Sequence, residues 1–229
     1  MCGRFALATD KKILAMLYDL DLRADFELRP RYNIAPSQKV LTLRLSPENG
    51  EKELNELKWG FVPFWADDPA IGNRMINARA ETAAEKPSFR NALKKRRLLV
   101  PASGFYEWKS EDGKKQPFFI YRRDEKPFSF AGLWERWDKG SDPLESFTIL
   151  TTEPNSLLSD LHNRMPVIIR AEDYSAWLNP DAEPNFLQQM MVPFPSEELT
   201  FHPVSRMVNK PSNDHPEIIQ DISEGKIMD

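Results

Sequence analysis

The sequence predicts an α+β fold whose core is a curled antiparallel sheet or barrel. Segments of strand and helix character follow one another in mixed order, without the regular strand–helix alternation of a doubly wound sheet. The strand-like runs are short, rich in β-branched and aromatic residues, and separated by turns such as Glu111-Asp112-Gly113. With 229 residues, 41% of them hydrophobic, the chain can bury a substantial core.

The individual elements follow from local signals. Thr9 or Asp10 caps a helix over about 10–20, and Pro87 opens a short helix over 87–95, since proline is tolerated at the first helical position. Further helices are expected at 154–161, 171–178 and 184–191. Strands are expected at 40–45, 57–61, 97–101, 104–109, 117–122, 128–136, 146–152 and 199–205. We interpret residues 1–229 as a single domain with a loose tail over 210–229.

Composition excludes several classes of protein. The longest uncharged stretch, 184–196, is too short to span a bilayer, and the N-terminus has no apolar run typical of a signal peptide. Cys2 is the single cysteine, so neither an intrachain disulfide nor a cysteine-based zinc site is possible. The three histidines are too scattered for a metal triad. We therefore expect a cytoplasmic protein without a metal.

Charge is unevenly distributed along the chain. The net charge is −4, but residues 1–100 carry 18 basic and 13 acidic side chains, whereas 101–229 carry 13 and 22. The stretch 71–100 alone has eight basic side chains against two acidic ones. Such a local basic surface is suited to binding phosphates. The alternative is that 94–97 is the solvated end of a helix, where cations favour the macrodipole.

Cys2 directly follows Met1. Initiator methionine is normally trimmed before a small residue, which would leave an α-amine and a thiol on adjacent carbons. Such a 1,2-aminothiol traps an aldehyde as an imine, and the thiol then closes a five-membered thiazolidine. The amine titrates at about 7.7–8.0 and the thiol at about 8.5, so this chemistry suits neutral pH. The alternative is a small apolar residue at a frayed chain end.

Seven short motifs then occur in a fixed order. They are MCGRF at 1–5, RYNIAP at 31–36, WGFVP at 59–63, INARAET at 76–82, GFYEWK at 104–109, LHNRMP at 161–166 and HPVS at 202–205. Together they strongly resemble the SRAP (SOS-response-associated peptidase) family over residues 2 to about 209. Each motif alone is weak, whereas the ordered set with cysteine at position 2 is highly specific.

The resemblance implies a definite activity. Members of this family are understood to bind single-stranded DNA at abasic sites and to crosslink to the aldehyde of the ring-opened sugar through the N-terminal cysteine. The implied product is a thiazolidine that shields the lesion during the DNA damage response. The implied fold is one α+β domain on a β-barrel-like sheet with a basic cleft and peripheral helices. No cofactor or metal is expected, and we expect a monomer that associates with the nucleoid when bound to DNA.

The resemblance also implies a role for each of four residues. Cys2 matches the nucleophile, and Asn77 matches the residue that holds the N-terminal amine. Glu107 matches the acid/base group, which requires burial to raise its pKa, and His162 matches the group that helps to open the sugar ring. The alternatives are that Asn77 is a turn residue, Glu107 pairs with Lys109 or an arginine, and His162 caps a helix.

DNA contacts are expected next to these residues. Arginines close to the site are expected to bind phosphate oxygens with forked hydrogen bonds, with a further contribution from an asparagine. Pro36 and Trp65 are candidates to wedge or stack against bases, although Trp65 can equally belong to the core. The expected phosphate contacts are Arg4, Asn33, Arg79 and Arg164.

Two other functions stay open. Cys2, His162 and Asn77 can be arranged as the nucleophile, base and orienting group of a thiol peptidase, including one that removes only its own leader. Alternatively, the chain is a non-covalent binder of modified DNA, whose binding would depend on salt but not on an aldehyde. The crosslinking activity itself is lyase-like or autopeptidase-like in its chemistry.

Overall fold

Two β-sheets form the core of the computed structural model, which describes residues 2–111 and 113–223. The first sheet has five antiparallel strands, in the order β13 (Leu199–Pro203), β8 (Lys114–Arg122), β7 (Gly104–Glu111), β1 (Phe5–Leu7) and β2 (Arg31–Ile34). The second has the order β11 (Met165–Pro166), β10 (Leu144–Thr152), β4 (Lys52–Trp59), β3 (Lys39–Leu45), β6 (Arg97–Ala102), β9 (Phe128–Trp137) and β12 (Ile168–Ile169), with β5 (Asn77–Arg79) paired to β10.

The second sheet closes on itself. Strand β9 pairs with both β6 and β10, so that β3, β4, β10, β9 and β6 form a continuous ring. Within the ring, β10 runs parallel to β4 and the other pairs are antiparallel. Outside the ring, β5 also runs parallel to β10. The predicted α+β fold with a barrel-like core is therefore confirmed, and the two parallel pairings are an addition to it.

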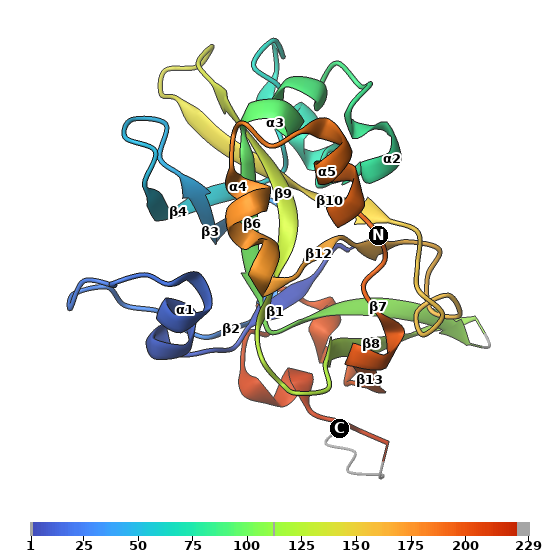
Figure 1. Ribbon diagram of the computed structural model, residues 1–229. Helices are drawn as coiled ribbons and strands as arrows, with labels where there is room; N and C mark the ends of the chain where they lie inside the picture. The colour runs from blue at the N-terminus through green and yellow to red at the C-terminus, as the bar shows by residue number, and fades with distance from the viewer. Residues whose placement is uncertain (1, 112, 224–229) are drawn as a thin grey trace.

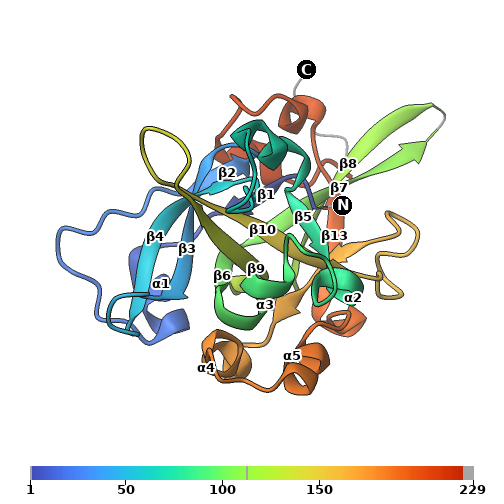
Figure 2. The same ribbon diagram turned by 90° about the horizontal axis from the view of Figure 1, so that it is seen from above.

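Short helices surround the sheets. They are α1 (Lys11–Tyr18), α2 (Ala80–Ala83), α3 (Arg90–Lys95), α4 (Tyr174–Leu178) and α5 (Pro184–Met190). Figure 1 shows α2, α3 and α5 together at one end of the molecule, with the C-terminal segment at the opposite end, and Figure 2 gives the view from above. The Asp10 cap is confirmed, because its Oδ1 accepts from the backbone N–H groups of Lys12 and Ile13.

Two predicted helices differ from the structure. The helix expected over 87–95 begins only at Arg90. The helix expected over 154–161 is wrong, because this segment forms a series of turns. Asn155 explains the difference: its Oδ1 accepts from the Leu158 N–H and its Nδ2 donates to the Phe194 carbonyl. A side chain that bonds nearby backbone in this way favours a turn over a helix.

The segment after Lys210 is packed against the first sheet as far as the structure describes it. Ile218 is fully buried in a cluster with Ala6, Tyr106 and Val208. The backbone N–H of Ile222 donates to the carbonyl of Pro203. The expectation of a loose tail is therefore wrong for residues 210–223, while 224–229 lie outside the described residues.

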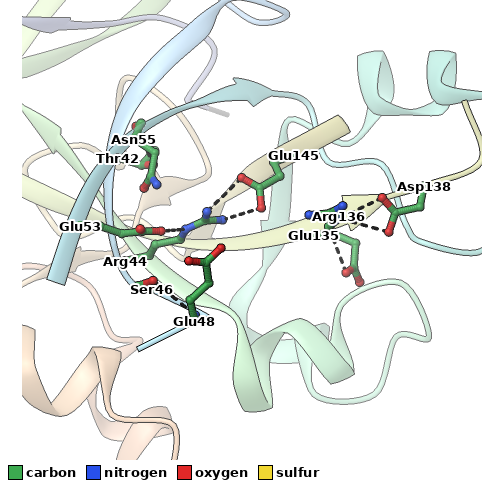
Figure 3. A network of polar contacts seen from close by, with 10 residues as sticks. All are labelled: Thr42, Arg44, Ser46, Glu48, Glu53, Asn55, Glu135, Arg136, Asp138 and Glu145. Atoms are coloured by element: carbon green, nitrogen blue, oxygen red, sulfur yellow. Dashed lines mark hydrogen bonds and ion pairs between the residues drawn. The ribbon is translucent and has the colours of Figure 1, made fainter. Parts of the chain in front are cut away.

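Arg44 links four strands of the ring at one end of the barrel (Figure 3). From β3, it donates to Glu53 on β4 at 2.7 Å and to both carboxylate oxygens of Glu145 on β10 at 3.0 Å. Its guanidinium also lies 4.1 Å from the ring centroid of Trp134 on β9. Charge-assisted hydrogen bonds in a forked geometry are strong and directional, so this cluster stabilises the closed arrangement.

Trp59 connects the barrel to β1 and to β5. Its ring is fully buried and packs edge-on against Phe5, with centroids 5.2 Å apart, and its Nε1 donates to the Ile76 carbonyl at 2.9 Å. We expect Trp59→Ala to lower the free energy of unfolding by about 3–5 kcal/mol through the cavity that it leaves. Urea denaturation measures this. Trp65→Ala is the control, since this ring is 44% exposed and should change stability by less than about 0.5 kcal/mol.

Among the residues that the structure describes, no helix is both long enough and apolar enough to cross a membrane.

Candidate active site

Cys2 lies just before β1 and beside β5. The side-chain amide of Asn77, the first residue of β5, donates to the Cys2 carbonyl at 2.9 Å. The Cys2 side chain is 0% exposed, and burial raises the pKa of its thiol well above the ordinary range. A second, smaller cause of this rise is the charge of Glu107, which places that carboxylate near the sulfur. The thiol is therefore protonated at neutral pH in this arrangement.

Glu107 reaches the same place from β7. Strands β1 and β7 pair with Phe5 opposite Phe105, and the Tyr106 N–H donates to the Arg4 carbonyl, so Glu107 falls opposite Gly3. Glu107 is only 4% exposed, and burial raises its pKa to about 7. A carboxyl group that titrates near neutrality can both give and take a proton under physiological conditions.

His162 lies in the turn that precedes β11. Its Nδ1 accepts from the Arg164 backbone N–H at 3.0 Å, so a neutral ring carries its proton on Nε2. Partial burial lowers the pKa of His162, which favours this neutral form. Residues 165–166 then pair with the end of β10, whose residue Thr151 also pairs with Arg79. The turn with His162 and the end of β5 therefore meet at the same end of β10.

Two of the expected phosphate-binding arginines also lie here. Arg79 ends β5 and is exposed. Arg164 donates to both carboxylate oxygens of Glu81 at 2.8 Å and to the Thr151 carbonyl at 2.6 Å. The hydrogen bonds from Arg164 lower the pKa of Glu81. Sequence reasoning missed Glu81 and Thr151 as partners of Arg164, although Glu81 belongs to the same motif as Asn77 and Arg79.

Arg4 and Asn33 contact each other and the C-terminal segment of the chain. Arg4 donates from Nη1 to Asn33 Oδ1 and to the Val208 carbonyl, both at 2.6 Å. Asn33 is 0% exposed, and its amide lies within hydrogen-bonding distance of three carbonyls of the C-terminal segment. Its burial argues against the direct DNA contact that we expected from the sequence.

Pro36 and Trp65 lie on neighbouring loops. Ser37, next to Pro36, donates to Asn73 at 3.2 Å, and Asn73 lines a hollow of about 560 Å³ with Trp65. Trp65 is 44% exposed and therefore does not belong to the core. Its neighbour Phe64, which sequence reasoning missed, is 51% exposed. Two adjacent exposed aromatic rings are the kind of surface on which unpaired bases stack.

A close glycine contact fixes the loop that carries these rings. Gly60 has φ 137°, and a Cβ there would lie 2.7 Å from the Gly72 carbonyl oxygen. The converse contact, from a Cβ on Gly72 to the Gly60 oxygen, would be 2.5 Å. Only glycine at both positions allows this approach of two backbone segments.

The basic run 94–97 divides in two. Lys94 and Lys95 are exposed at the end of α3, as in the solvated-helix interpretation. Arg96 pairs with Glu135 at 2.7 Å, and Arg97 is buried with its guanidinium on backbone carbonyls such as that of Trp177. Within residues 2–111 and 113–223, no group of three or more His, Cys, Asp or Glu side chains is arranged to hold a metal ion.

The chain is similar to several known proteins. A family model described as "SOS response associated peptidase (SRAP)" matches residues 1–211. The chain is 43% identical to "Abasic site processing protein YoqW" of Bacillus subtilis (strain 168), covering 96% of this chain and 99% of that protein. It is 34% identical to "Abasic site processing protein YedK" of Escherichia coli (strain K12), covering 97% and 100%. A crystal structure of a Bacteroides thetaiotaomicron protein matches with a TM-score of 0.85 at 30% identity, covering 96% of this chain and 99% of the other.

Proposed function

Because the chain belongs to the SRAP family, we propose that it binds single-stranded DNA at abasic sites and crosslinks to them covalently through Cys2 after Met1 has been removed. Two relatives named as abasic site processing proteins support the choice of lesion. The observation that carries the proposal is the meeting of Cys2 with Asn77 and with a carboxyl group of pKa about 7.

The chemistry is a condensation in two steps. The α-amine of Cys2 adds to the aldehyde carbon of the ring-opened sugar, and loss of the hydroxyl group as water gives an imine. The thiol then adds to the carbon of the protonated imine, forming a C–S bond and leaving a neutral N–H, while its proton passes to the Glu107 carboxylate. One water leaves overall, nothing is oxidised or reduced, and the product is a thiazolidine.

The surrounding residues have separate roles in this scheme. Asn77 holds the backbone of Cys2 and so restrains the direction of the amine. The protonated Glu107 carboxyl donates to the departing hydroxyl group, and its carboxylate then accepts the thiol proton, which the raised pKa of the thiol makes necessary. His162, with its proton on Nε2, donates to the sugar ring oxygen as the ring opens.

The DNA strand is assigned to the exposed surface around these residues. Arg79 and Arg164 bind phosphates on either side of the lesion, whereas Arg4, opposite Tyr106 on β7, lies on the other face of the first sheet from Glu107 and takes no part in DNA binding. Pro36 and Trp65 contact the neighbouring bases. An abasic nucleotide has no base to unstack, so its sugar is easily displaced toward Cys2.

The experiment compares three single strands of one sequence: one with an abasic site, one intact, and one whose abasic aldehyde has been reduced to an alcohol with borohydride. Intact mass first establishes that Met1 is absent. We expect an adduct that survives denaturing electrophoresis with the first strand only, and its mass should equal protein plus DNA minus one water. Equal, purely non-covalent binding of all three strands would contradict the proposal, as would cleavage of a peptide panel without any adduct.

A further inference from the structure

A nucleophile at the second residue of a chain needs support, because chain ends fray unless they are tied down. Cys2 lies outside β1, which begins at Phe5. The hydrogen bond from Asn77 fixes its carbonyl from one side. The next side chain along the strand with long-range contacts is Arg4, two residues away.

Arg4 is held on the opposite face of the sheet from Glu107. It lies opposite Tyr106, whose N–H donates to the Arg4 carbonyl at 3.0 Å, and side chains alternate between the faces of a strand. On this face Arg4 meets Asn33 and the carbonyl of Val208, which belongs to the C-terminal segment over residues 204–222. The C-terminal segment therefore holds β1 on the face opposite Glu107, and we call the contacts of Arg4 and Asn33 with this segment the clamp.

Asn33 is the centre of this clamp. Its Oδ1 accepts from Arg4, while its Nδ2 lies 3.2, 3.1 and 2.6 Å from the carbonyls of Val208, Lys210 and Asn213. The side chain is completely buried, so no water replaces these bonds. A buried amide that loses its partners is costly, which makes the arrangement of Arg4 and the C-terminal segment mutually dependent.

Asp214 attaches the C-terminal segment to β2, next to Asn33. Its Oδ1 accepts from the backbone N–H groups of Tyr32 and Asn33, and its Oδ2 accepts from Arg31 at 3.0 Å. The two backbone bonds fix the segment to β2. The ion pair with Arg31 is partly exposed, with side chains 32% and 26% accessible, and contributes less.

We propose that the C-terminal segment positions Cys2 from the reverse face of the first sheet, with Asn33 and Asp214 as positioning residues that act through Arg4. The clamp suppresses fraying of residues 2–4 and so keeps the cysteine beside Asn77 and Glu107. Its meaning for catalysis rests on the proposed function, whereas its effect on Cys2 itself does not.

The first test is the rate of alkylation by iodoacetamide, followed by intact mass. Cys2 is the only cysteine, so the modified residue is unambiguous. We expect slow alkylation of the wild type and a rate at least about tenfold higher in Asn33→Ala, because local opening then exposes a thiol that is otherwise buried. At low urea concentrations the alkylation rate of Asn33→Ala should not change with urea. Global unfolding would instead make the rate rise with urea, because it exposes much more surface than local opening does.

Matched variants separate positioning from loss of stability. Leu14→Ala removes a buried side chain of α1 and serves as the control, because it should lower thermal stability about as much as Asn33→Ala does. It should leave the alkylation rate of the native protein unchanged. Asp214→Ala should raise the alkylation rate even if Asn33→Ala does not fold. Asp214→Asn keeps the Oδ1 acceptor and should largely restore protection. Unchanged alkylation in folded Asn33→Ala or Asp214→Ala would overturn the proposal.

The second test uses abasic DNA. In Asp214→Ala we expect the first-order rate of adduct formation at saturating DNA to fall about tenfold, since orientation of the nucleophile is lost. Affinity for the borohydride-reduced strand should stay the same, which a loss of DNA contacts would not allow. If the wild type forms no adduct, the proposed function fails while the alkylation result still decides the role of the clamp. A normal rate in Asp214→Ala with rapid alkylation would overturn the catalytic part alone.

Discussion

Replacing Cys2 with alanine is expected to abolish the denaturant-resistant adduct with abasic single-stranded DNA, a loss of at least about 1,000-fold in rate. The α-amine of the variant can still form an imine, but no thiol is present to close the ring, and the intramolecular advantage of that closure is large. The imine hydrolyses in denaturant, so it leaves no stable product. Denaturing electrophoresis after a fixed incubation, with intact mass of any product, measures the effect.

Retention of residue 1 gives the complementary test. A protein that carries an N-terminal tag keeps the Cys2 thiol but has no free amine on that residue, and it should also fail to form the adduct. Affinity of both proteins for the borohydride-reduced strand should match that of the wild type, since none of the proposed DNA contacts is altered. An undiminished adduct from the tagged protein would show that the N-terminal amine takes no part.

Glu107→Gln is expected to lower the first-order rate of adduct formation by about 100- to 10,000-fold, the usual contribution of a positioned acid–base group. In the wild type the rate should follow a bell-shaped pH profile. It rises as the amine, with a pKa of about 7.7–8.0, loses its proton. It falls as Glu107, whose pKa burial raises to about 7, loses the proton that it must donate. Glutamine removes the second titration, so the rate of the variant should rise with pH to a plateau.

Glu135 provides the matched control for this experiment. It is also buried, at 5% exposed, and burial raises its pKa, but it pairs with Arg96 on the barrel. Glu135→Gln should leave both the rate and the pH profile of adduct formation unchanged. A descending limb that survives in Glu107→Gln would assign the acid to another group.

The longer strands of both sheets could be predicted from the sequence because their signals are local. The runs at 97–101, 104–109 and 128–136 are apolar and β-rich, and each lies within a strand. Strands β1 and β5 were missed, since each has three residues and exists only through pairing with distant partners such as β7 and β10. The parallel pairing of β10 likewise depends on closure of the ring, which no local pattern encodes.

The candidate site likewise contains residues whose positions the sequence predicts and one, Asn33, whose position it does not. The family resemblance placed Cys2, Asn77, Glu107 and His162 in one proposal. In the structure Asn77 donates to the Cys2 carbonyl, and Glu107 falls opposite Gly3, next to Cys2. Asn33 carried the same kind of motif signal, yet its burial could not be foreseen. That burial is created by residues 208–214, whose polar sequence is typical of an exposed tail and reveals nothing of the carbonyls that Asn33 binds.

The contact between Gly60 and Gly72 has a consequence for how a flexible strand is recognised. Single-stranded DNA loses many conformations when it binds, and a surface that had to order itself at the same moment would add its own entropic penalty. The loop with Phe64 and Trp65 is already braced by two backbone segments in close contact, so its ordering is settled during folding. A side chain at either glycine would leave Phe64 and Trp65 in the sequence but would separate the two backbone segments. The loop would then become ordered only when DNA binds, and the entropic penalty of its ordering would weaken binding.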